Sequence, residues 1–122
     1  MKLRIRGNTI RFRLTQPEVT RLRDGASLRD STEFAPAERL TWVLEPAPAI
    51  SAIEAGYRDG TVCVRLPESD VRSWADTDAV GIYGQAGVLE VTVEKDFRCL
   101  TRAGAAEEEA GAFPNPHEGG KC

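Results

Sequence analysis

The sequence has few of the residues on which disulfide frameworks, metal sites and catalytic triads depend. It contains three cysteines, one histidine and 7% aromatic residues in 122 positions. A small, odd number of cysteines argues against a disulfide framework and for reduced thiols. A single histidine leaves little material for a Ser-His-Asp or Cys-His arrangement. Gly-x-Gly-x-x-Gly, P-loop and Gly-x-Ser-x-Gly motifs are also missing. These absences favour a protein that is not an enzyme.

Long apolar runs are missing as well. No run approaches the roughly 18 residues that a membrane span needs, and residues 1–14 alternate arginine with apolar side chains instead of forming a signal-peptide core. We therefore expect no membrane partner and a cytoplasmic location. With 41% apolar and 29% charged residues, the chain has the composition of one soluble domain.

The charge is slightly negative overall and unevenly distributed. The formal net charge is −3 and the isoelectric point is about 5.2, which argues against a specific nucleic-acid partner. Residues 1–30 nevertheless carry eight basic side chains and three acidic ones. Such an asymmetry is typical either of a site for anions or of an acidic tail.

The first part of the chain has clear local signals. Residues 2–14 alternate polar and apolar side chains around Gly7-Asn8, which predicts a hairpin. Thr15 lies three residues before Glu18, and this capping box predicts a helix that ends near Gly25.

The second half of the chain repeats this pattern. Shifted by 52 positions, residues 5–22 align with residues 57–74, turn on turn and helix on helix, and residues 40–45 align with residues 89–94 at an offset of 49. We interpret the chain as a duplicated strand-strand-helix-strand-strand unit. The repeats span about residues 2–45 and 53–94 within one domain over residues 1–100, and residues 101–122 form an extended, acidic tail containing Pro and Gly.

The repeat predicts an α+β fold. Hairpin-length turns favour a mainly antiparallel sheet of about eight strands with two short helices, arranged as a closed or half-closed barrel. We expect the apolar phase of the strands to face inward with the apolar helical positions. The expected core residues are Leu3, Ile5, Ile10, Phe12, Leu14, Val19, Leu22, Leu40, Trp42, Leu44, Ile53, Tyr57, Val62, Val64, Leu66, Val71, Trp74, Val80, Ile82, Leu89, Val91 and Val93.

The opposite phase of the strands is rich in arginine. Guanidinium groups on neighbouring strands repel each other unless carboxylates or a bound anion neutralise them. The face is therefore either a solvated surface with weak ion pairs or a site for a small anionic ligand or an acidic protein surface, on a monomer or a homodimer. The candidate anion-binding residues are Arg4, Arg6, Arg11, Arg13, Arg58 and Arg65.

The order of elements loosely resembles that of the CYTH-type triphosphate tunnel proteins, in which duplicated units close a wide barrel lined with charged residues. This resemblance implies an alternative fold, a tunnel barrel, and an alternative function, metal-dependent hydrolysis of triphosphate. In that case Glu90 and Glu94 would hold a divalent ion and the arginines would bind phosphate. The opening strand of that family, Glu-x-Glu-x-Lys, is replaced here by residues 2–6, which read KLRIR.

The chain as a whole resembles a small bacterial family of unknown function. The similarity lies in the opening over residues 1–8, in residues 13–15 and 93–100, and in an acidic tail that contains Asn-Pro and ends in Cys122. The resemblance implies no activity.

The tail carries a second candidate site. Cys99, His117 and Cys122 are ligand types that suit zinc or another thiophilic ion, although their spacing is unlike that of paired zinc motifs. The alternative is a buried Cys99 and an exposed terminal thiol. Cys63 shares the arginine phase, where neighbouring positive charge would lower the pKa of its thiol.

Overall fold

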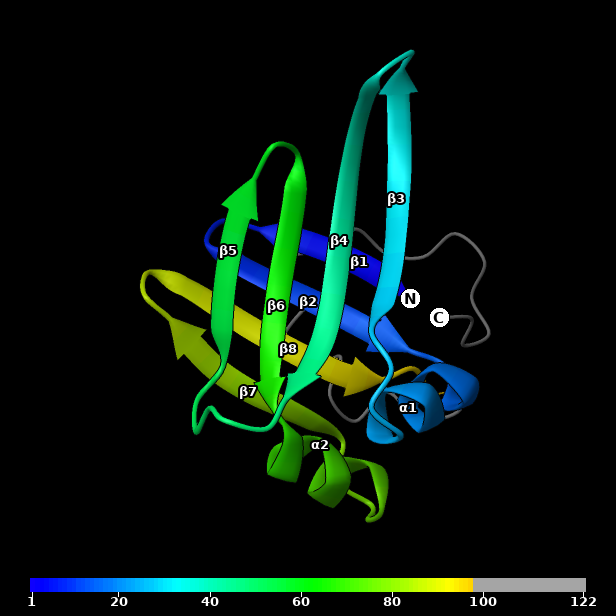
Figure 1. Cartoon of the computed structure of the whole chain (residues 1–122), viewed down its shortest axis with the longest axis vertical. Coiled ribbons are helices and arrows are strands. Elements are labelled where there is room, and N and C mark those ends of the chain that lie inside the picture. Colours follow the sequence, from blue (N-terminus) through cyan, green and yellow to red (C-terminus); the bar gives the residue numbers. More distant parts are fainter. Residues whose placement is uncertain (98–122) are drawn as a thin grey trace, which may run out of the picture.

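The computed structural model describes residues 1–97, which form eight strands and two helices in the predicted order (Figure 1). Each repeat is a hairpin, a helix and a second hairpin, so the predicted duplication is confirmed. The first repeat contains β1 (Lys2–Arg6), β2 (Thr9–Leu14), α1 (Gln16–Arg23), β3 (Leu28–Ala35) and β4 (Glu38–Ala47). The second contains β5 (Glu54–Arg58), β6 (Thr61–Pro67), α2 (Glu68–Ala75), β7 (Gly81–Ala86) and β8 (Leu89–Lys95).

The local signals of the first repeat act as expected. The Thr15 N–H donates a hydrogen bond of 2.9 Å to Oε1 of Glu18, which closes the predicted capping box at the start of α1. Gly25 follows α1 with a φ of +98°, and the N–H of Ala26 donates to the carbonyl of Arg21, so the glycine ends the helix in a left-handed conformation.

The strands form two four-stranded sheets. Sheet A has the order β1-β2-β8-β7 and sheet B the order β3-β4-β6-β5. Each sheet therefore contains one hairpin from each repeat. Among the described strands, four neighbouring pairs are antiparallel, whereas the central pairs β2–β8 and β4–β6 are parallel. Short turns do force antiparallel hairpins, as expected, but strands from different repeats are free to meet in parallel.

The two sheets are related by the same residue offsets that relate the repeats. In sheet A, Thr9 lies opposite Glu90, and in sheet B Thr61 lies opposite Thr41. Positions 9 and 61 differ by 52 and positions 41 and 90 differ by 49, which are the offsets found in the sequence. The register of the central parallel pair is thus the same in both sheets, and the molecule has an approximate internal twofold.

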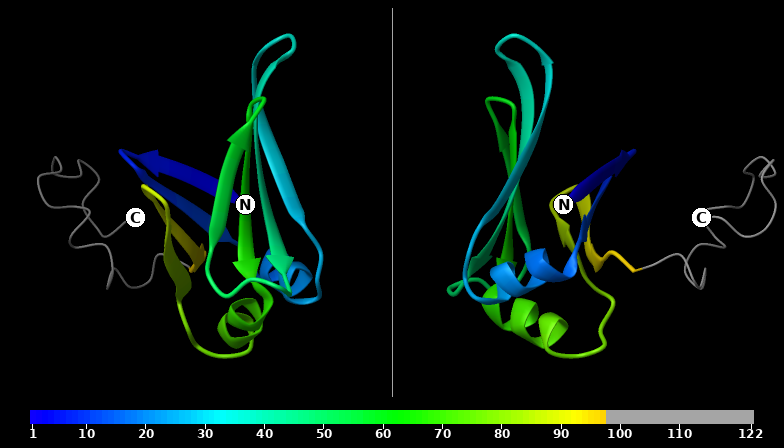
Figure 2. Two further views of the ribbon diagram at one scale, coloured as in Figure 1. Left: turned by 60° about the vertical axis from the view of Figure 1, so that its left-hand side comes forward. Right: turned by 90° about the vertical axis from the view of Figure 1, so that its right-hand side faces the viewer.

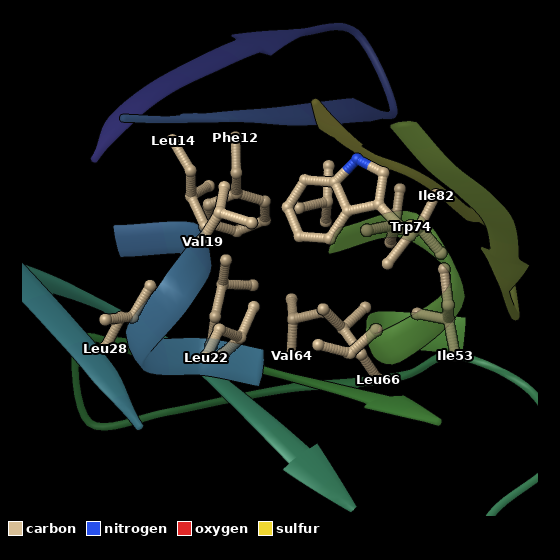
Figure 3. Packing of buried hydrophobic residues seen from close by; sticks show 14 of the residues in the cluster. Phe12, Leu14, Val19, Leu22, Leu28, Ile53, Val64, Leu66, Trp74 and Ile82 are labelled. Atoms are coloured by element: carbon tan, nitrogen blue, oxygen red, sulfur yellow. The ribbon is translucent and has the colours of Figure 1, made fainter. Parts of the chain in front are cut away.

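The core lies between the inner faces of the sheets and the helices (Figure 3). The two helices occupy one end of the molecule and pack against each other, while the β3–β4 hairpin extends farthest in the opposite direction (Figures 1 and 2). The indole Nε1 of Trp74, a side chain only 2% exposed, donates 2.9 Å to the carbonyl of Val80. Fully buried apolar side chains come from both sheets and both helices: Phe12, Leu14, Leu22, Leu44, Val64, Leu66, Val71, Val91 and Val93.

Three predicted core residues are exposed instead. Ile5 and Tyr57 are 58% and 70% exposed, and Val80 is 48% exposed. Ile5 and Tyr57 occupy equivalent places on the edge strands β1 and β5, one residue before the last strand residue at the hairpin turn. Both side chains belong to the apolar phase of their strands, as predicted. They are exposed because the opposite sheet does not cover an edge strand near its turn. Val80 precedes β7 and belongs to no strand.

The described strands form no closed barrel, because the two sheets are separate. The apolar phase faces the core and the arginine phase lies on the outer faces, so the tunnel barrel given as the alternative is wrong for this chain. No helix among the described residues is long and apolar enough to cross a membrane.

Candidate anion-binding face

The outer face of sheet A concentrates positive charge along one pair of strands. Ile10, Phe12 and Leu14 of β2 are buried, so the residues between them point away from the core. Strand β1 pairs with β2 in antiparallel register, and paired residues share a face. We call the five cationic residues that result the basic face: Lys2, Arg4, Arg6, Arg11 and Arg13.

The register sets two pairs of cations of the basic face directly opposite each other. Arg4 pairs with Arg11, and Lys2 pairs with Arg13. Arg6 instead pairs with Thr9, next to the turn at Gly7. Like charges in cross-strand pairs destabilise a sheet unless neighbouring negative groups offset them.

A shallow hollow of about 480 Å³ opens on this face. Gly7, which adopts a φ of +55° in the turn, is one of the residues around it. The volume lies within the range of small-molecule sites, roughly 300 to 1,000 Å³. The lining residues are Arg4, Arg6, Gly7, Thr9, Arg11 and Glu90.

Strand β8 places carboxylates beside these cations. The Thr9 hydroxyl donates 2.9 Å to Oε1 of Glu90. The turn is attached to the start of β8, because Nδ2 of Asn8 donates to the carbonyl of Val88 and the N–H of Glu90 donates 2.8 Å to the carbonyl of Asn8. Glu90 is therefore held at the rim of the hollow.

A second carboxylate orients Arg11. Oε1 of Glu94 lies 3.8 Å from Nε of Arg11, and the Tyr83 hydroxyl donates 3.0 Å to Oε2 of the same carboxylate. Burial raises the pKa of Tyr83, and the hydrogen bond to Glu94 raises it further, so the phenol stays protonated and remains a donor. The side chains of Arg11 and Glu94 are only 23% and 18% exposed.

Arg58 and Arg65 lie elsewhere. They belong to the outer face of sheet B, on the opposite side of the core, so the structure brings together only four of the six candidate arginines. Arg65 is already flanked by carboxylates: its Nη1 lies 3.2 Å from Oε1 of Glu54 and its Nε 3.7 Å from Oε2 of Glu45.

Comparison of equivalent positions shows that the second repeat keeps only two of the five cations of the basic face, since Arg58 and Arg65 correspond to Arg6 and Arg13. At the offset of 52, Arg4 corresponds to Gly56 and Arg11 corresponds to Cys63, and these two residues are again directly paired. Lys2 corresponds to the acidic Glu54. The accumulation of positive charge is thus a property of sheet A and does not follow from the fold.

Cys63 does not have the environment of an activated thiol. Burial raises the pKa of its thiol, and the nearby Glu45 carboxylate raises it further, against a smaller opposite effect of Arg65. The expected lowering by neighbouring arginines is therefore wrong. The other thiol candidates, Cys99 and Cys122, and the proposed ligand His117 lie outside the described residues. Within residues 1–97, no group of three or more His, Cys, Asp or Glu side chains is placed to hold a metal ion.

The chain was compared with models of protein families. Residues 1–117 match the model of DUF7009, a family of unknown function. The chain belongs to the DUF7009 family. The resemblance to a small family of unknown function is thereby confirmed, and the matched segment contains the whole basic face of this DUF7009 protein. No curated protein and no solved structure shows a significant match to it.

Two residues of the DUF7009 site were not recognised in the sequence. Thr9 and Tyr83 look like ordinary strand residues, and their role depends on carboxylates of β8. Thr9 pairs with a strand that lies 81 positions away in sequence. The one available signal was the four-residue spacing of Glu90 and Glu94, which places two carboxylates on the same face of a strand.

Proposed function

We propose that the basic face of sheet A binds a small anionic ligand, and that the protein acts as a binding or accessory domain without catalytic activity of its own. One observation carries the proposal: the cross-strand pair Arg4 and Arg11 lies with Arg6 around a hollow of about 480 Å³ on a face where basic side chains outnumber acidic ones. A cytoplasmic location, expected from the missing apolar run and signal-peptide core, is part of the same proposal.

The chemistry of arginine supports this function. A guanidinium group presents several donors in one plane and binds phosphate or carboxylate oxygens in pairs. Two such groups lie on neighbouring strands and a third lies at the turn. Around a hollow, these groups can contact one anionic group together, which they could not do on a flat, extended surface. A concave site therefore favours a small ligand over a flat acidic protein surface.

The direct test is titration of ¹⁵N-labelled protein with inorganic tripolyphosphate at low ionic strength, because salt screens exposed charges within about 10 Å at 0.1 M. We expect saturable chemical-shift changes that are confined to β1, β2 and β8. Arg6→Gln should weaken binding about fivefold to tenfold, because one charged hydrogen bond at a partly exposed site is lost.

The internal twofold supplies a matched control for this titration. Arg58→Gln removes the same group from the equivalent position on sheet B, which leaves the charge of the chain identical to that of Arg6→Gln. It should leave tripolyphosphate binding unchanged. Equal weakening by both variants would mean that only the overall charge matters and would contradict the proposal. Binding of an acidic peptide but not of tripolyphosphate would identify the face as a protein-docking surface instead.

Hydrolysis of triphosphate remains a prediction that the same material can test. Glu90 and Glu94 lie on the same outer face as Arg4 and Arg11, so a divalent ion would have carboxylates within this face. Incubation of tripolyphosphate with the protein and Mg²⁺ or Mn²⁺ should release no orthophosphate above that of the Arg4→Gln and Arg11→Gln double variant. Release that depends on both arginines would support the enzymatic alternative.

A further inference from the structure

The hollow on the basic face combines three guanidinium groups with one carboxylate, that of Glu90. A carboxylate beside guanidinium groups offsets their mutual repulsion, but it also repels a bare anion. Under the proposed function, the presence of the Glu90 carboxylate in this lining must be explained by the chemistry of the ligand.

Glu90 is not required by the fold. Its equivalent in sheet B is Thr41, which occupies the same register position beside Thr61 in the parallel pair β4–β6. The fold therefore accepts a neutral residue at this position. Of the two equivalent positions, only the one on the basic face carries a carboxylate.

The geometry leaves the carboxylate available to a ligand. Glu90 is exposed at the rim, and the hydrogen bond from Thr9 engages its Oε1. The backbone contacts between Asn8 and β8 fix the strand that carries it. A carboxylate oxygen accepts hydrogen bonds and donates none, so the complementary ligand group is a donor.

The surrounding charge selects the type of donor. An ammonium group would pair with Glu90 but would be repelled by Arg4, Arg6 and Arg11. A hydroxyl group donates to the carboxylate without adding positive charge. The hollow of about 480 Å³ is also several times larger than one phosphate group, so it has room for the polar body of a phosphorylated molecule.

We infer that the ligand of the basic face is a phosphorylated polyhydroxy compound, such as a sugar phosphate, whose phosphate lies against Arg4 and Arg11 and whose hydroxyl groups donate to Glu90. Glu90 then acts as a specificity-determining residue. The inference rests on the proposed anion-binding function and adds the class of the ligand to it.

The test compares ribose 5-phosphate with methyl phosphate, two dianionic monoesters that differ in their hydroxyl groups. Affinities are measured by chemical-shift titration at pH 7.5 and low ionic strength. For the native protein we expect ribose 5-phosphate to bind about fivefold to tenfold more tightly than methyl phosphate. In Glu90→Gln we expect methyl phosphate to bind about twofold to fivefold more tightly than it does to the native protein, because the repulsion is removed. The preference for the sugar phosphate should then fall to twofold or less.

Glu54→Gln is the matched control, because it neutralises one exposed strand carboxylate on the opposite face. It should preserve the preference for ribose 5-phosphate. If tripolyphosphate binds but both monoesters bind equally to native protein, or if Glu90→Gln keeps the preference, the assignment of the ligand class is wrong and the anion-binding function stands. If neither tripolyphosphate nor either monoester binds, both are wrong.

Discussion

Tyr83 shares the Glu94 carboxylate with Arg11. Its hydroxyl satisfies one oxygen of Glu94, while the other oxygen faces Arg11 at 3.8 Å. A carboxylate with fewer donors of its own attracts a neighbouring guanidinium more strongly. Arg11 and Tyr83 therefore lie on the same carboxylate, and the phenol is its neutral partner.

Replacement of Tyr83 by Phe should lower the affinity for tripolyphosphate by about twofold to threefold, because Glu94 then competes more strongly for Arg11. Tyr57→Phe is the matched control, since Tyr57 is an exposed strand tyrosine in sheet B. Chemical-shift titration measures both variants. An unchanged affinity in Tyr83→Phe would show that the phenol does not influence the site.

Glu18 links the start of α1 to the start of the chain. Its carboxylate accepts hydrogen bonds from the Thr15 N–H and from the terminal ammonium of Met1. Burial alone would raise the pKa of Glu18, but the hydrogen bonds from the terminal ammonium and from Thr15 outweigh it, and the pKa lies below its ordinary value of 4.5. A carboxyl group whose pKa is lowered by folding stabilises the native state where it is ionised.

The stability difference between native protein and Glu18→Gln should therefore depend on pH. It should be fully present above pH 4.5 and disappear as the pH falls through the lowered pKa of the folded state. Thermal unfolding of untagged protein between pH 7 and pH 2.5 measures this difference. Asp70→Asn in the equivalent turn of α2, which lacks a capping box, should show much less pH dependence. If the effect of Glu18→Gln on stability does not depend on pH, the stabilising role assigned to the ionised Glu18 carboxylate is wrong.

These residue-level features differ in how far the sequence alone could reveal them. The capping box joins Thr15 to Glu18 within one helical turn, so it was predictable from spacing. Tyr83 and Thr9 act through β8, and the contact between Thr9 and Glu90 spans 81 positions. Such a partner can be named only when the pairing of the strands is known.

At the scale of elements, the hairpin turns decide where each strand pair ends. Asp59 and Gly60 form the turn between β5 and β6 with φ angles of +51° and +76°. The carbonyl of Gly60 accepts a 2.8 Å hydrogen bond from the Thr41 N–H, which joins this turn to β4 of the first repeat. The turn thus fixes the start of the parallel pair β4–β6.

Gly60→Ala should destabilise the protein by about 1 to 3 kcal/mol, because it combines an unfavourable positive φ with a steric clash. An added Cβ would lie 2.8 Å from the carbonyl oxygen of Arg39. Gly56→Ala is the control within the same hairpin, since nothing lies within 4 Å of its added Cβ. Urea denaturation compares the two. Equal stabilities would contradict the role assigned to this turn.

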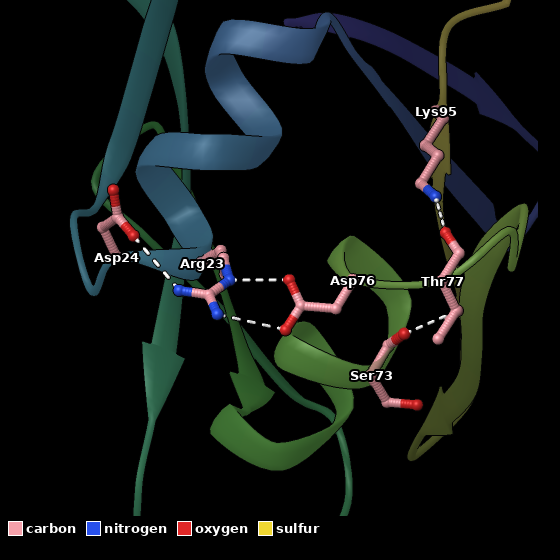
Figure 4. Close-up of polar contacts among 6 residues, drawn as sticks. All are labelled: Arg23, Asp24, Ser73, Asp76, Thr77 and Lys95. Atoms are coloured by element: carbon pink, nitrogen blue, oxygen red, sulfur yellow. Dashed lines mark hydrogen bonds and ion pairs between the residues drawn. The ribbon is translucent and has the colours of Figure 1, made fainter.

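The helices carry a second connection between the repeats. Nε of Arg23 at the end of α1 donates 2.7 Å to Oδ1 of Asp76, directly after α2, and Nη2 donates 3.1 Å to Oδ2 (Figure 4). Both groups are exposed, so this pair orients the helices more than it stabilises them. The sequence predicted both helices, but it gave no indication that their ends meet.

At the scale of the molecule, the repeats exchange hairpins, in the sense that each sheet combines one hairpin from each repeat. Periodicity and turn residues identified the repeated unit because these signals are local, and the offsets of 52 and 49 relate the register of one central pair to that of the other. The sequence could not show that β2 pairs with β8, since either repeat could have formed a sheet of its own. It could therefore not show that Arg58 and Arg65 lie on the face opposite Arg4 and Arg11.

This exchange predicts that neither repeat is stable alone. Both parallel pairs, β2–β8 and β4–β6, join strands from different repeats, so separation leaves each central strand with one neighbour and exposes the inner apolar faces. Fragments 1–50 and 51–122 should each show little fixed tertiary structure at micromolar concentration. When mixed, they should form a one-to-one complex in which the fluorescence of the buried Trp74 shifts to that of the intact chain.

Sedimentation and near-ultraviolet circular dichroism distinguish the possible results. A homodimer of fragment 1–50 would agree with the exchange, because the second copy would supply the missing hairpins at equivalent positions. A folded monomer of fragment 1–50 would contradict it, since one hairpin of each sheet would then suffice to bury the core. Addition of tripolyphosphate extends the experiment to the basic face. Glu90 and Glu94 belong to the second fragment, and all five basic residues belong to the first. Only the reassembled complex therefore contains the complete hollow.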